Sequence, residues 1–469
     1  MLTIHAWLHR IRCVRDDEGM GILEVIFALA IFIVVASGIA YSAISSLRLS
    51  SDSEARVVAT NIAASEIDNA RANGDPLTLF DDTRVITVDG LAYTVRRDVE
   101  WVDSLGTTSG CTGTGALQFK SVDVKVDWPT KLQMTSPVRS NTLIAPLTRI
   151  NDPSFGTILV SVTTDGGTGM PGIPVSVSQI TGGAPVVMSD TDADGCSYAF
   201  GVAPGSYTVK LSKPTYLSSA QEPEPESKVM EIKAGNTASA PFQYDAAATF
   251  KLKMASTSTA AGILFPSNLD STFVNTYGVF NFATPVSTGT QAVVKAHPFN
   301  TGYSAFAGRF SLPAAAAGST PADLGCMSPD PASWPAGTVN SIALRAGARA
   351  PAATAAPGAS ANLDVPMGVV TFRYTGVDRV YLTANTVTPP AGSGNPGCVN
   401  GLTYRFATQM RTGSSYSVAL PYGSWKLAVW TNVNGSGSTY AVTDVLTGVG
   451  GTVGTPAANV VTLDPRLPL

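Results

Sequence analysis

A stretch of 23 residues without a charged side chain lies near the start of the chain, from Val25 to Leu47. A leader containing three arginines precedes it and ends in Gly19-Met20, and Glu24 is the last charged residue before the stretch begins. A helix of this length spans about 35 Å, which is enough to cross the hydrocarbon core of a bilayer. A carboxylate that reached the bilayer centre would cost roughly 2.5–3.5 kcal/mol, so Glu24 is a candidate for a functional role.

The order of these residues resembles the prepilin-type N-terminus of type IV pilins and type II secretion pseudopilins. The resemblance implies that a prepilin peptidase cleaves between Gly19 and Met20, and that the new amine of Met20 is methylated. It also implies that Glu24 pairs with the N-terminal amine of a neighbouring subunit, because two opposite charges buried together cost far less than either alone. Residues 59–71 resemble the helix that follows in PilV-type and GspI-type minor subunits.

Two other interpretations of the N-terminus stay open. One is an ordinary secretory signal cleaved among the small residues 36–40, and the other is a plain uncleaved membrane anchor. Asp16, Asp17 and Glu18 separate the arginines from the apolar stretch, whereas a signal keeps its positive charge adjacent. The stretch is also longer than the usual apolar region of a signal. Both observations favour the prepilin interpretation.

The predicted fold class is α+β for the pilin part, with a long N-terminal helix on an antiparallel sheet, followed by all-β sandwich modules. Residues 20–72 are predicted to form one helix, because apolar residues between 55 and 70 recur at i, i+3 and i+4. Asp89-Gly90 predicts a hairpin between strands 83–88 and 91–101. Residues 119–128 alternate between valine and charged residues, and 138–147 are expected to add an edge strand.

The predicted organisation has five parts. They are a leader (1–19), a pilin-like domain (20–150) with a transmembrane helix (20–47), and three β modules (154–245, 247–348 and 363–469). Residues 154–245 resemble CnaB-like and carboxypeptidase-regulatory-like modules, which are seven-strand sandwiches of prealbumin-like topology. Pro204-Gly205-Ser206-Tyr207 and Pro421-Tyr422-Gly423-Ser424-Trp425 both lead into a strand, which predicts a duplicated sandwich. Residues 313–362 are rich in Ala, Pro and Gly and are interpreted as a ragged end and a linker.

Four cysteines lie beyond the membrane helix, and an even count outside the cell favours disulfides. The favoured pair is Cys326–Cys398, since both residues lie in Gly/Pro-rich loops flanking the last module. Closing a loop of about 70 residues would contribute roughly 4 kcal/mol. Pairing of Cys111 with Cys196 is the weaker prediction, because the two residues belong to different predicted domains.

The sequence gives little support for catalysis or for a cofactor. It contains no P-loop and no Gly-x-Ser-x-Gly elbow, and His297 is the sole histidine after residue 9. No catalytic residue, cofactor or metal is therefore assigned. Asp190, Asp192 and Asp194 resemble the start of a calcium loop and form a weak calcium candidate. The position that would need a glutamate is Gly201, and the same residues suit an ordinary turn.

These observations predict a minor type IV pilin-like subunit, low in copy number or placed at the tip, because so large a head would clash if repeated along a filament. The expected partners are the prepilin peptidase, the major pilin and other minor pilin subunits, the inner-membrane assembly platform, and a ligand on another surface. A nucleic-acid partner is not expected, since the formal charge is −4. The precursor is expected to cross the cytoplasmic membrane once, and the assembled subunit to lie in a pilus at the cell surface. The alternatives are a type II secretion-type pseudopilin and a permanently anchored surface adhesin that does not assemble.

Overall fold

The computed structural model describes residues 21–72, 79–103, 108–109, 117–129, 137–145, 153–183, 185–285, 291–312, 325–398, 401–441, 445–449, 452–453 and 460–468. Side chains are described for these residues except 103, 108–109, 117–118, 440–441, 445–449 and 452–453. The chain divides into two compact units, one of residues 1–109 and 118–149 and the other of residues 110–117 and 150–469. Each unit has hydrophobic core residues of its own.

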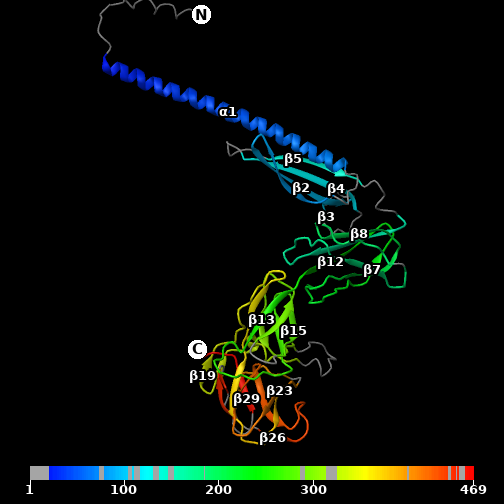
Figure 1. Cartoon of the computed structure of the whole chain (residues 1–469), viewed down its shortest axis with the longest axis vertical. Coiled ribbons are helices and arrows are strands. Elements are labelled where there is room, and N and C mark those ends of the chain that lie inside the picture. The colour runs from blue at the N-terminus through cyan, green and yellow to red at the C-terminus, as the bar shows by residue number, and fades with distance from the viewer. Residues whose placement is uncertain are drawn as a thin grey trace, which may run out of the picture. The chain divides into compact units, whose positions relative to one another are not determined.

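The first unit is a long helix lying on one antiparallel sheet (Figure 1). Its elements are α1 (Ile22–Ala72), β1 (Asp82–Val88), β2 (Leu91–Asp103), β3 (Thr108–Ser109), β4 (Leu117–Asp127) and β5 (Val138–Ile144). The strand order is β1-β2-β4-β5, and β3 pairs with β2. Asp89 and Gly90 both have positive φ at the turn between β1 and β2, as a tight hairpin turn requires. The predicted hairpin is confirmed.

The core of the first unit forms between one face of α1 and the sheet. The helix contributes mainly alanines to this contact, including Ala59 and Ala63, and β4 contributes Val122, Val124 and Val126, which are completely buried. Small side chains allow a helix to approach a sheet closely, so valines from the sheet can fill the space between them. The apolar stripe and the alternating strand predicted from the sequence are both confirmed.

The second unit begins with seven strands in two sheets. They are β6 (Gly156–Thr163), β7 (Val175–Gln179), β8 (Cys196–Val202), β9 (Gly205–Leu211), β10 (Tyr216–Ser218), β11 (Met230–Ile232) and β12 (Thr237–Ala246). One sheet has the order β10-β12-β6-β8 and the other has the order β11-β9-β7. Residues of both sheets, such as Val160 and Val209, share one core. The last strand, β12, pairs parallel to the first strand, β6.

The strands after Ala247 form further sheets around one continuous core. They are β13 (Ala248–Met254), β14 (Asp270–Val274), β15 (Val279–Ala283), β16 (Gln291–Ala296), β17 (Ser304–Ala307), β18 (Gly337–Val339), β19 (Ile342–Leu344), β20 (Ser360–Val365), β21 (Gly368–Arg373), β22 (Val380–Thr386), β23 (Thr403–Met410), β24 (Ser415–Leu420), β25 (Gly423–Trp430), β26 (Thr439–Ala441), β27 (Val445–Val449), β28 (Thr452–Val453) and β29 (Val460–Asp464), together with a short 3₁₀ helix (Pro331–Ser333). The sheet orders are β16-β13-β20, β15-β14-β17, β18-β19, β24-β21-β27 and β23-β22-β25-β29-β28, with β26 on β25. A single cluster of buried side chains extends from Ala248 to Leu463.

The structure differs from the linker interpretation of residues 313–362 at its C-terminal end. Strand β20 begins at Ser360 and pairs parallel to β13, so it completes the sheet that β13 began. Earlier in the same segment Trp334 is completely buried, and its Nε1 donates a hydrogen bond to the carbonyl of Ser328 at 2.8 Å. The fold class, a long helix on a sheet followed by β-sandwich modules, is confirmed, whereas the five-part division of the chain stays a prediction.

Candidate functional site: the exposed helix and the braced corner

The first 30 residues of α1 form a free apolar helix. Every residue from Gly21 to Ser51 is exposed except the half-buried Ala36, and Ile22 reaches 83% exposure. Within the described residues α1 is the one helix long and apolar enough to cross a membrane, a test that a signal sequence near the N-terminus also passes. So large an apolar surface on a folded protein normally marks a contact with another protein or with a membrane.

Glu24 lies in the first turn of this helix, where the helix dipole favours a negative charge. Its backbone N–H donates to the carbonyl of Gly21 at 2.9 Å, and its side chain is exposed. Gly19 and Met20, the two residues of the predicted cleavage site, lie outside the described residues. The roles of Gly19, Met20 and Glu24 therefore stay predictions.

A buried carboxylate fastens the second half of α1 to the sheet. Glu66 is 4% exposed, and its Oε1 accepts a hydrogen bond from Arg84 of β1 while its Oε2 lies 3.9 Å from Nη1 of Arg97 on β2. Arg71 adds a hydrogen bond of 2.8 Å to Thr142 of β5. Glu66 is not among the site residues predicted from the sequence. The available signal was its spacing, since it lies three residues after Ala63 and four before Ala70 and so belongs to the apolar stripe.

A short structural motif occurs twice in the second unit, at residues 204–207 and 421–425, where the sequence contains the repeated Pro-(x)-Gly-Ser-aromatic pattern. In the first copy Gly205 has φ of +157°, and the hydroxyl of Tyr207 donates to the carbonyl of Ala203 at 2.9 Å. In the second copy Gly423 has φ of +143°, and Nε1 of Trp425 donates to the carbonyl of Pro421 at 2.8 Å. In both copies the aromatic side chain donates a hydrogen bond to the carbonyl four residues earlier in the chain. The glycine between them has a backbone conformation that other residues rarely adopt. We call each arrangement an aromatic corner.

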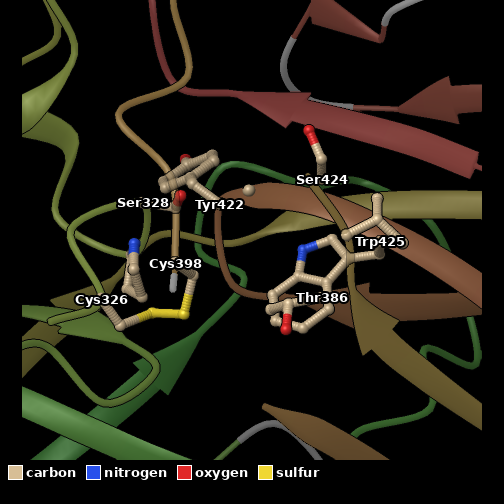
Figure 2. Close-up of a pocket in the computed structure, with 10 residues that line it drawn as sticks. Cys326, Ser328, Thr386, Cys398, Tyr422, Ser424 and Trp425 are labelled. Atoms are coloured by element: carbon tan, nitrogen blue, oxygen red, sulfur yellow. A yellow bond between two sulfur atoms is a disulfide. The ribbon is translucent and has the colours of Figure 1, made fainter. Parts of the chain in front are cut away.

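A disulfide lies beside the second aromatic corner (Figure 2). The structure joins Cys326 to Cys398, the pair that the sequence analysis favoured. The backbone N–H groups of Met327 and Ser328 both donate to the carbonyl of Gly397, at 3.0 and 3.1 Å. The disulfide thus reinforces a contact between two loops that are already held together by hydrogen bonds.

A narrow hollow lies between this disulfide and Trp425. About 0 Å³ of it can be occupied by a water-sized molecule, whereas typical small-molecule pockets have roughly 300–1,000 Å³. Its polar groups bond to the protein itself. The hydroxyl of Ser424 contacts that of Thr462 at 2.8 Å and accepts from Asn395 at 2.9 Å, and the hydroxyl of Ser328 donates to Asn395 at 2.5 Å. The hollow is therefore part of the bracing of the corner.

The remaining predicted site residues are less closely grouped. Oδ1 of Asp192 accepts hydrogen bonds from the backbone N–H groups of Asp194 and Cys196, at 3.0 and 2.8 Å, which is the work of a turn residue. Asp190 is exposed, and in the described residues no group of three or more His, Cys, Asp or Glu side chains is placed to hold a metal ion. Cys196 is disulfide-bonded, and its partner lies outside the described residues, as Cys111 does. Pairing of Cys111 with Cys196 stays a prediction.

Comparisons with known proteins give distant structural resemblances alone. No protein-family model matches the chain, and no curated protein matches it. Among solved structures, the Bacillus anthracis TIE protein is 11% identical with a TM-score of 0.19, over 78% of this chain and 73% of that chain. The major pilin subunit of Bacillus cereus is 9% identical with a TM-score of 0.19, over 63% of this chain and 94% of that chain. The shaft pilin of Lactobacillus rhamnosus GG is 11% identical with a TM-score of 0.16, over 45% of this chain and 98% of that chain. Scores this low carry no weight for the function of this chain.

Proposed function

We propose that the chain is a minor type IV pilin-like subunit, low in copy number or placed at the tip, that displays β-sandwich modules outside the cell for attachment or pilus assembly. The observation that carries the proposal is the division of α1. Its first 30 residues present apolar side chains to solvent, whereas buried residues from Asp52 to Ala70 hold its second half on a sheet. One continuous helix of 51 residues therefore joins an anchor to a folded head.

The exposed half of α1 needs a cover of apolar groups. Burying apolar surface is favourable by about 25 cal/mol per Å², so this half would be stable in a bilayer or among the helices of neighbouring subunits and unstable in water. Before assembly the cover is the cytoplasmic membrane. After assembly it is the bundle of major and minor pilin helices, which the chain joins with the help of the inner-membrane assembly platform.

The position of Glu24 fits such a transfer. Its carboxylate lies one turn into the helix, where the amine of a cleaved Met20 on a neighbouring subunit supplies the opposite charge. Pairing the two charges removes most of the cost of burying either of them. The prepilin peptidase creates that amine by cutting between Gly19 and Met20 and then methylates it.

The distal modules support a role in attachment rather than in turnover. The polar side chains around the hollow at the second aromatic corner hydrogen-bond to one another, and the Cys326–Cys398 disulfide lines the same hollow. A catalytic site needs polar groups directed at a substrate, whereas these side chains maintain the fold. The modules are thus suited to present a stable surface, and no enzymatic activity is proposed.

The test is mass spectrometry of the N-terminus of the protein from native membranes. We expect a chain that starts at Met20 with a methylated amine, and we expect Gly19→Leu to leave unprocessed precursor. The matched control is Gly21→Ala, because a β-carbon at Gly21 meets nothing within 4 Å. An N-terminus near residue 39 or 41 would identify a secretory signal, and an intact leader in the native protein would identify a plain anchor. Either result overturns the proposal.

A further inference from the structure

Charge is distributed unevenly between the proximal and distal parts of the chain. Residues 248–469 contain 12 Lys and Arg against 7 Asp and no Glu, a net charge of +5. Residues 20–247 contain 15 basic and 24 acidic residues, a net charge of −9. The part of the chain farthest in sequence from the membrane helix is therefore basic, although the whole chain is acidic. Such an asymmetry favours an anionic partner for the distal modules.

Three lysines lie on one face of the β16-β13-β20 sheet, which we call the lysine face. Lys251 and Lys253 alternate with the buried Phe250 and Leu252 on β13, and Lys295 is exposed between buried neighbours on β16. The register pairs Lys251 with Val293 and Thr249 with Lys295, so Lys251 and Lys295 are diagonal neighbours.

The geometry of a sheet fixes the spacing of these charges. Diagonal neighbours on adjacent strands are about 7–8 Å apart, and Lys253 follows Lys251 two residues along the strand, at about 7 Å. Within the described part of the chain, none of the three lysines forms an ion pair. Asp364 of β20 is the register partner of Lys253 and offsets one of the three charges. The lysine face therefore keeps a net positive charge, and its lysines are spaced at roughly equal distances along a line.

The other residues of the lysine face indicate which polyanion it suits. Besides Asp364, the exposed neighbours are Gln291, Val293, Ser360 and Asn362, which include hydroxyl and amide groups but no aromatic ring and no arginine. Aromatic rings stack on bases in single-stranded nucleic acid, and arginine is the usual bidentate ligand of phosphate. Amide and hydroxyl groups between point charges are suited to hydrogen-bond the hydroxyls of sugars.

We propose that the lysine face binds an acidic polysaccharide, in which carboxylates recur along a chain of hydroxyl-bearing sugars. The inference deepens the proposed function, on which it rests for display outside the cell, because it names the class of ligand that the distal modules hold. The ammonium groups of Lys251, Lys253 and Lys295 contact successive carboxylates, and the amides of Gln291 and Asn362 contact the intervening hydroxyls.

The experiment measures binding of full-length protein in detergent to immobilised alginate, a polyuronate, at about 50 mM and about 200 mM salt. The test variant is Lys251→Gln/Lys253→Gln/Lys295→Gln. The matched control is Lys228→Gln/Lys233→Gln/Lys426→Gln, which removes three exposed lysines from other strands and segments. Dextran serves as a neutral polysaccharide, and a 20-nucleotide single-stranded DNA serves as a competing polyanion.

We expect alginate binding to weaken at the higher salt concentration and the Kd of the test variant to rise at least tenfold, while the control variant binds like wild type and dextran does not bind. Absence of alginate binding by the wild-type protein, or an equal loss in both triple variants, would overturn the proposal. Tighter binding of the DNA than of alginate would assign the face to nucleic acid and would overturn it too. All variants replace exposed side chains, so their melting temperatures should match wild type. None of these results depends on cleavage at Gly19, so failure here leaves the test of the proposed function intact.

Discussion

At the scale of single residues, burial determines the hydrogen bonding and the charge state of His297. The ring is completely buried, and Nδ1 lies 2.9 Å from the carbonyl oxygen of Leu217, so Nδ1 carries the hydrogen and donates it. Nε2 is buried without a hydrogen-bond partner. Gln221 accepts from the backbone N–H of His297 at 2.8 Å, and Tyr303 donates to its carbonyl at 2.7 Å. The histidine therefore joins the β6–β12 sandwich to the sheets that follow it, and it does so as a neutral ring.

This arrangement predicts that the second unit loses stability as the pH falls below about 6.5. Burial lowers the pKa of His297 from its ordinary value of 6.5, and the hydrogen bond to Leu217 and the charges of Asp245 and Asp165 offset part of the effect. The unfolded chain then takes up a proton at a higher pH than the folded one, so stability is complete above 6.5 and falls below it. Burial raises the pKa of Asp245 above its ordinary value of 3.8, so this carboxyl acts in the opposite direction and adds stability as the pH falls from the raised pKa toward 3.8.

Calorimetry at about pH 7.5 and about pH 5.5 should show the loss as a fall of roughly 2–4 °C in melting temperature. His297→Asn keeps a donor near the carbonyl of Leu217 but cannot titrate, so the variant should lose most of this pH dependence. If the variant and the wild type fall by the same amount, another group is responsible.

Two acidic residues on the buried face of α1 should respond to replacement in opposite ways. Asp52 is 8% exposed and its Oδ2 has no hydrogen-bond partner, whereas Glu66 lies between Arg84 and Arg97. We expect Asp52→Ala to raise the free energy of unfolding by about 1 kcal/mol, since a buried unpaired oxygen is removed. We expect Glu66→Ala to lower it by about 2 kcal/mol, a value reduced because Arg84 is partly exposed.

Chemical denaturation of the full-length protein in detergent would measure both changes, with the exposed Glu54→Ala as a neutral control on the same helix. A destabilised Asp52→Ala variant would instead mean that the carboxylate of Asp52 stabilises the fold.

The aromatic corners permit a replacement that removes one hydrogen bond and little else. Tyr207→Phe deletes the hydroxyl that bonds to Ala203 and keeps the buried ring, so it should cost about 1 kcal/mol of stability. Tyr216→Phe is the matched control in the same sandwich, because its hydroxyl makes no hydrogen bond among the described residues and Tyr216 contributes through its ring contact with Tyr244. Equal melting temperatures for the two variants would show that the back-bond does not stabilise the corner.

At the scale of elements, the sequence predicted the structures that depend on nearby residues. The helix and the β1–β2 hairpin follow from the spacing of alanines and from Asp89-Gly90, both of which lie within the element that they specify. The parallel pairing of β20 with β13 has no such local signal, because more than 100 residues separate the partners in sequence. An Ala/Pro/Gly-rich composition therefore favoured a linker where the chain in fact completes a sheet.

The same limit applies to the candidate site. The apolar helix, Glu24 and the aromatic corners could be recognised from short motifs. The ion pairs of Glu66 and the lysine face could not be recognised in this way. Arg84 and Arg97 reach Glu66, and Lys295 reaches Lys251, only because of which strands pair and in which register. Register depends on which strands pair, and that choice is made by the whole core.

For α1 itself, we expect Glu24→Gln to spare membrane insertion and to impair assembly. The amide lowers the cost of placing the side chain in a bilayer and removes the charge that a neighbouring amine requires. The measurement compares the amount of protein in membranes with the amount in sheared filaments, and we expect at least a tenfold loss from filaments alone. Recovery of the variant in filaments at the wild-type level would show that Glu24 has no pairing role.

At the scale of the whole molecule, the second unit is closed by its last residues. The guanidinium of Arg466 is buried, pairs with Asp464 at 2.6 Å, and donates to the carbonyls of Pro335 and Ser393 at 2.9 and 2.5 Å. It also lies 5.4 Å from the ring centre of Trp334. The chain end thus connects segments that are more than 70 residues away, so truncation there should affect the whole core built from Ala248 to Leu463.

The separate cores of the two units lead to a prediction for a chain without residues 154–469. The core under α1 is built from residues between Ala55 and Ile144, and those of the second unit lie between Ile158 and Leu463. The deletion should therefore leave the first unit folded and cleavage at Gly19 intact, while attachment is lost. Cys111→Ser is included in the deletion, since Cys196 is removed with the second unit and Cys111 is its predicted partner.

Immunoblotting reports processing, and adhesion of whole cells reports attachment. Loss of protein export without loss of adhesion would favour the type II secretion-type pseudopilin. Wild-type adhesion together with wild-type export would reject a role for the displayed modules. Unprocessed precursor would show that residues 154–469 are needed before cleavage.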